Sequence, residues 1–186
     1  MKNVAYILML IALLGSESCD GTKRESENEI FVINELFMLR TEGMILCQIA
    51  EAADSDRQIL NACDRFHAYY AATQPEFLSL CDGRSIALDE SDFDTIWENV
   101  ERGVKKNAVF SKSDFITLTT DNILRSIALH EIILERMEWE DVSYYAFKSL
   151  PELYNQQQLL SDLRRSEHEN SPEARVAEVH NSAIAL

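Results

Sequence analysis

Asp64 and His67 stand three residues apart in the stretch NACDRFHAYY, whose apolar residues have helical spacing. At that offset a carboxylate and an imidazole project from one face of a helix and can share a metal ion. If this helix and the preceding one form an antiparallel hairpin about its polar turn, Glu42 lies level with His67. Glu131, from a later helix, could complete a set of ligands for one iron, manganese or zinc ion.

The same residues also have an interpretation without metal. A histidine beside an apolar stripe is commonly a residue at the edge of the core that bonds a neighbouring carboxylate, and a contact between Glu42 and His67 would be enough. The sequence contains no Gly-rich phosphate loop, Gly-x-Ser-x-Gly, Cys-x-x-Cys or His-Glu-x-x-His motif. We therefore expect no cofactor and no enzymatic activity, and we keep a metal-binding or oxidoreductase bundle as the alternative.

Cys47 and Cys63 fall one residue from the same height across the predicted hairpin. Inward-facing cysteines on two packed helices can come within the ~7 Å between Cα atoms that a disulfide requires. Export would deliver them to a compartment where disulfides persist. We expect either a Cys47–Cys63 disulfide, with Cys81 left free, or two buried thiols that act as small apolar residues.

The elements that must position these residues are helices. Apolar residues recur at steps of three, four and seven, first over residues 30–53 and then from a polar turn, capped by Asp54 or Ser55, to a stop at Gly83. Further helices are predicted near residues 90–105, from Ser111 or Ser113 to about Trp139, and from near Asp141 to residue 165. Pro75 and Pro151 should bend or break their helices. Two hairpins joined by a long helical connection predict an all-α, antiparallel four-helix bundle over residues 30–165.

The first residues predict export. Lys2 precedes an apolar run, Val4–Leu14, that is much shorter than the ~20 residues of a spanning helix, and small residues lead to Cys19. We interpret residues 1–18 as a signal peptide, Cys19 as the site of lipid attachment and residues 19–29 as a polar tether. A plain secreted protein with a stray thiol is the alternative. Residues 166–186 lose the dense apolar spacing and predict a mobile tail.

The charge of the chain limits its partners. It carries 17 basic and 32 acidic residues, a net charge of −15, and removal of residues 1–18 takes away one residue of each sign. A polyanion does not attract nucleic acid or anionic lipid headgroups. The expected contact with a membrane is therefore the lipid anchor alone, in the periplasm or at the outer membrane, and the sequence does not identify a protein partner.

Four segments, in this order, resemble the bacterial exported ferritin-like domains of unknown function: EGMILCQIAEAADS, DSDRQILNACDRFH, the SDF that opens the third long helix, and SLPELYNQQQLL. The resemblance covers residues of about 30–165 and implies a ferritin-like bundle. Gln156 and Ile127 occupy the places of two of that family's histidines, whereas His67 keeps its place, so the resemblance implies a reduced set of metal ligands in this member. The signal region resembles lipoproteins of the Bacteroidetes type. The predicted function is a structural or interaction module of the cell envelope.

Overall fold

The structure is a computed structural model that describes residues 27–53, 56–82, 86, 90–104, 110–136 and 139–169. The predicted signal peptide and Cys19 lie outside these residues. Every regular element within them is a helix, which confirms the all-α prediction for this part of the chain. The helices are α2 (Glu27–Ala52), α3 (Arg57–Cys81), α4 (Glu90–Val104), α5 (Lys112–Arg136) and α6 (Glu140–Glu169). None of them has the length and apolarity that crossing a membrane requires.

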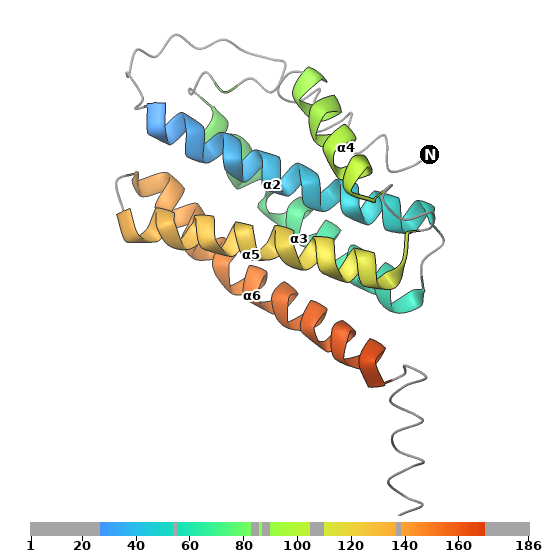
Figure 1. Ribbon diagram of the computed structural model, residues 1–186. Helices are drawn as coiled ribbons and strands as arrows, with labels where there is room; N and C mark the ends of the chain where they lie inside the picture. Colours follow the sequence, from blue (N-terminus) through green and yellow to red (C-terminus); the bar gives the residue numbers. More distant parts are fainter. Residues whose placement is uncertain are drawn as a thin grey trace, which may run out of the picture.

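The four long helices pack as a bundle, and the shorter α4 lies against α2 (Figure 1). Helix α2 contacts α3 and α5, and α6 contacts α3 and α5. Lys112, at the start of α5, forms an ion pair of 3.1 Å with Asp56, which precedes α3. Helices α3 and α5 therefore begin at the same end of the bundle, and each long helix runs antiparallel to the two that it contacts.

Side-chain caps fix where two of these helices begin. Asp56 caps α3: its Oδ1 accepts hydrogen bonds from the backbone N–H groups of Gln58 (2.8 Å) and Ile59 (3.1 Å), while the predicted caps, Asp54 and Ser55, lie outside the described residues. At α5 the predicted Ser111 cap is confirmed, because its hydroxyl accepts from the Asp114 N–H (3.1 Å) while the Asp114 carboxylate accepts from the Ser111 N–H (3.0 Å).

The prolines do not break their helices, and the bundle extends past its predicted bounds. Pro75 lies inside α3 and Pro151 inside α6, both of which are continuous. In the turn before Pro75, the Thr73 hydroxyl donates to the Tyr69 carbonyl (2.9 Å), so side-chain bonds and packing support the helix there. Helix α2 begins at Glu27, inside the predicted tether, and α6 runs to Glu169, inside the predicted tail.

Two apolar clusters make up the core of the bundle. One gathers residues such as Ile33, Phe77 and Ile133, and the other gathers residues such as Cys63, Phe66 and Ile123. Each long helix also carries a polar residue among these contributions: on α3, α5 and α6 it stands between the residues of the two clusters, and on α2 it stands among those of the first cluster. We call these four residues the polar layer: Arg40, Thr73, His130 and Ser149.

Candidate functional site

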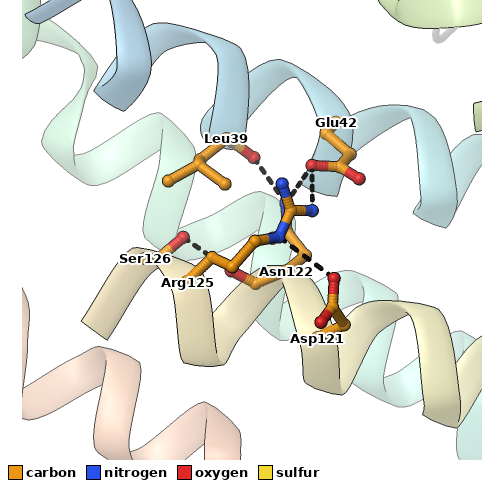
Figure 2. A network of polar contacts seen from close by, with 6 residues as sticks. All are labelled: Leu39, Glu42, Asp121, Asn122, Arg125 and Ser126. Atoms are coloured by element: carbon orange, nitrogen blue, oxygen red, sulfur yellow. Dashed lines mark hydrogen bonds and ion pairs between the residues drawn. The ribbon is translucent and has the colours of Figure 1, made fainter. Parts of the chain in front are cut away.

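Glu42 does not meet His67. Its Oε2 accepts from the Arg125 guanidinium (2.5 Å) and from the Asn122 side-chain amide (3.1 Å), both on α5 (Figure 2). Equal height along a hairpin does not decide the direction in which a side chain points around its helix. Glu42 points toward α5, whereas the prediction required it to point toward α3.

His67 instead bonds Glu51, with 3.1 Å between Nε2 and Oε1. Helical side chains lean toward the N-terminus of their own helix. In this antiparallel hairpin His67 therefore leans toward the turn and Glu51 leans away from it, so they meet although their Cα atoms lie at different heights. The sequence predicts a bond between His67 and a carboxylate, Glu42, at the edge of the core. In the structure His67 makes that bond with Glu51.

The other two predicted ligands lie apart from these pairs. Asp64 is exposed on α3, and Glu131, on α5, accepts a hydrogen bond of 2.5 Å from the Tyr154 hydroxyl. Within the described residues, no group of three or more His, Cys, Asp or Glu side chains could hold a metal ion. The predicted set of Glu42, Asp64, His67 and Glu131 is therefore not assembled.

The cysteines are buried free thiols. Cys47, Cys63 and Cys81 form no disulfide, although Cys63 Sγ lies 3.9 Å from the Cys47 carbonyl oxygen. The register that placed Cys47 and Cys63 at one height is thus right, and the alternative of two buried thiols describes them. The pKa of the Cys47 thiol is raised by its hydrogen bond to Cys63 and by burial, which keeps it protonated and unreactive.

Arg40, which the sequence reasoning did not single out, lies buried in the polar layer with 7% of its surface exposed. One terminal nitrogen donates to the Thr73 hydroxyl and the Tyr145 hydroxyl, each at 2.8 Å. The other donates to the Tyr70 carbonyl and the Gln74 side-chain oxygen, each at 3.0 Å. All four acceptors are neutral.

Aromatic rings add to this cage. The Arg40 guanidinium carbon lies 5.1 Å from the centre of the Tyr70 ring and 5.0 Å from that of Phe77. Both distances are within the range at which a ring face attracts a cation. The buried charge is therefore stabilised by dipoles and ring faces, which is uncommon because buried charges are usually paired with an opposite charge.

His130 is the titratable member of the polar layer. Its Nδ1 donates to the Ser126 carbonyl (2.6 Å), because a carbonyl can only accept, and Nε2 has no hydrogen-bond partner among the described residues. Burial lowers the pKa of His130 to about 4, and the nearby charge of Arg40 acts in the same direction. His130 is thus neutral at pH 7.

A groove of about 270 Å³ lies on the outer side of the bundle, between α2, α4 and α5. Its apolar lining is Met38, Leu39, Leu46, Ile96, Val100 and Leu118, and its remaining lining is Glu35, Glu42, Asn99, Gly103 and Arg125. The side chain of Arg125 is 48% exposed and that of Glu42 is 25% exposed. Arg125 also bonds Asp121 (3.0 Å) on its own helix (Figure 2).

Asn122 holds the Glu42 carboxylate from the inner side. This residue is fully buried, and its amide nitrogen donates to the Leu39 carbonyl (2.9 Å) as well as to Glu42 (Figure 2). Asn122 could have been noticed in the sequence, because it stands four residues after Leu118, an apolar residue that packs against the core.

The groove and the polar layer differ in the chemistry open to them. The groove combines an apolar floor with carboxylates that reach solvent, so it can exchange ions and bind a ligand. The polar layer is shielded from water, and its cation, the Arg40 guanidinium, already has its acceptors. The polar layer therefore serves to hold the helices in register.

Comparisons of the chain with protein-family models, with curated proteins and with solved structures found no match.

Proposed function

We propose that the protein is an exported, lipid-anchored envelope protein whose acidic helical bundle acts as an interaction module and not as an enzyme. The observation that carries this proposal is a row of exposed aromatic side chains on α6, Tyr144, Phe147 and Tyr154, which we call the aromatic stripe. Phe147 is 67% exposed, the largest value among the large hydrophobic side chains that are exposed in the described residues.

The spacing of the aromatic stripe places it on one face of α6. Steps of three and seven residues separate Tyr144, Phe147 and Tyr154, and such steps return to the same side of a helix. Aromatic residues are enriched at the cores of protein interfaces, and exposed apolar patches mark sites of association. With a net charge of −15, we expect a protein partner that surrounds an apolar contact with basic residues.

The order of the helices supports a ferritin-like arrangement for this module. Helices α3 and α5 begin at the same end, so the connection that contains α4 must return along the bundle. One such crossover is typical of ferritin-like bundles. The ferritin-like bundle, the resemblance to exported envelope domains and the lipid on Cys19 are parts of the same proposal.

Fractionation of cells tests the anchor. We expect the wild-type protein in the membrane fraction with acyl mass on Cys19, and Cys19→Ala in the soluble fraction of the envelope. A soluble wild-type protein without acyl mass would contradict this part of the proposal.

Crosslinking in living cells tests the aromatic stripe. A photoreactive phenylalanine at position 147 should give a discrete protein adduct that is absent when the same group replaces exposed Asp64 on α3. With the crosslinked partner purified, Phe147→Ser should weaken its binding at least about tenfold, as loss of a central aromatic contact does. Leu124→Ser, which removes a 45%-exposed apolar side chain outside the stripe, should leave binding unchanged. Equal adducts at both positions, or unchanged binding by Phe147→Ser, would overturn the proposal.

A further inference from the structure

We propose that the groove between α2, α4 and α5 binds a small organic cation, a primary amine on an apolar body, with the ammonium group on Glu35 and Glu42. This inference rests on the groove alone and does not depend on the aromatic stripe or on the anchor.

The apolar part of the ligand is indicated by the lining of the groove. Six apolar side chains from three helices form it, and its volume of about 270 Å³ lies close to the lower end of the range for small-molecule sites. Burial of an apolar body there would remove it from water, which is the main source of affinity for such a ligand.

The cationic part is indicated by the balance of charges. Glu35 and Glu42 stand seven residues apart on α2, and both line the groove. The Glu35 carboxylate makes no hydrogen bond or ion pair with another described residue, and Asp121 adds a third negative charge next to Arg125. Three carboxylates against one guanidinium leave the site negative, so it favours a cation over an anion.

Arg125 provides a way for the ligand to reach Glu42. Its guanidinium bonds Asp121 through Nε and Glu42 through a terminal nitrogen (Figure 2). Because its side chain is half exposed, Arg125 can release Glu42 to an ammonium group and keep its bond to Asp121. Asn122, which donates to Glu42 from the inner side, would keep the carboxylate in place during this exchange.

Gly103 offers a means to block the groove without disturbing the bundle. It lines the groove from α4. Apart from its two chain neighbours and the adjacent backbone of its own helix, no atom lies within 4 Å of the position that a Cβ atom would take. A leucine at this position would enter the space that the ligand needs. It would also replace a glycine inside a helix, where glycine is unfavourable.

The probe that we choose is n-hexylamine, with hexanoate and hexanol as matched ligands that lack the ammonium group. Titration is followed by the chemical shifts of backbone amides in α2, α4 and α5. We expect saturable binding of hexylamine, with shifts centred on Glu42 and Val100, and at least about tenfold weaker binding of hexanoate.

Variants locate the site. Gly103→Leu should weaken hexylamine binding at least about tenfold without lowering the melting temperature, and Glu35→Gln and Glu42→Gln should each weaken it about threefold or more. Thr117→Leu, a neutral addition at an exposed position of α5 outside the groove, should have no effect. No saturable binding of hexylamine, equal binding of hexanoate, or unchanged binding by Gly103→Leu would each overturn the proposal.

Discussion

Arg40 on α2 and Arg125 on α5 both bind several acceptors, but they differ in burial and in the charge of those acceptors. Arg40 is 7% exposed and donates to two hydroxyls, a carbonyl and an amide oxygen. Arg125 has a side chain that is 48% exposed and donates to two carboxylates. The buried cation thus has only neutral partners, while the cation at the surface has the ionic ones.

This difference separates what holds the bundle together from what it can exchange. The Arg40 guanidinium is buried, so water has little access to the bonds by which it links α2, α3 and α6. Water can replace the carboxylates as acceptors for Arg125, and dissolved cations can replace Arg125 at Glu42. The bonds of Arg125 therefore contribute little to stability but leave Glu42 available. The polar layer is therefore a structural device, and the groove is the place where a ligand can act.

The largest effect should follow from Arg40→Met, which keeps the apolar stem but leaves two buried and two half-buried acceptors without their donor. We expect a loss of about 4 kcal/mol in the free energy of unfolding, measured with urea. Adding Tyr145→Phe should recover part of that loss, because one of the abandoned acceptors is then removed. Arg40→Met with unchanged stability would show that the polar layer does not hold the helices.

The next effect concerns His130 and pH. Burial lowers its pKa to about 4 from 6.5 in an unfolded chain, so between these values the unfolded state binds a proton that the folded state does not. Stability should therefore fall as pH decreases from 6.5 to 4, by up to about 3 kcal/mol from this group. Urea unfolding across this range should show a shallower fall for His130→Gln. Parallel curves for the two proteins would contradict the burial of a neutral His130.

The smallest effect should follow from Arg125→Met. Removing a half-exposed guanidinium should change the free energy of unfolding by about 1 kcal/mol or less. The same change should tighten the binding of hexylamine, because its ammonium group would no longer have to displace the Arg125 guanidinium from Glu42. A loss of stability as large as that of Arg40→Met would remove the distinction between the two arginines.

Much of the fold could be predicted from the sequence, because helical periods and caps are local. The Ser111 cap and the common height of Cys47 and Cys63 follow from residues near one another in the chain or across one turn. The directions of side chains around the helices depend on how all the helices pack. For this reason the predicted height of Glu42 along the hairpin agrees with the register that Cys47 and Cys63 show, whereas its predicted pairing with His67 is wrong.

Gly43 shows a signal that could have been used. It stands inside a helix, where glycine is costly and often marks a close approach. In the structure the Tyr70 hydroxyl occupies the space where a side chain at position 43 would lie, and Asn122 Oδ1 lies close by. The absence of a side chain at Gly43 therefore leaves room for Tyr70. The backbone carbonyl of Tyr70 accepts a hydrogen bond from Arg40, and its ring lies against the Arg40 guanidinium.

The sequence also could not reveal that Arg40 is buried, because an arginine in a mostly apolar stripe can reach solvent along its stem. Its burial depends on Thr73, Gln74 and Tyr145, which lie far along the chain. The groove depends likewise on α4 meeting α2, a contact that no local pattern specifies.

Nuclear magnetic resonance of the arginine side chains in the wild-type protein tests the contrast most directly. A buried guanidinium held by four acceptors should rotate slowly and exchange its protons slowly with water, so the terminal N–H groups of Arg40 should give separate, protected signals. Those of Arg125 should be averaged and exchange rapidly. The signals are assigned by their loss in Arg40→Met and Arg125→Met. Rapid exchange at Arg40, or equal protection at both residues, would contradict the account.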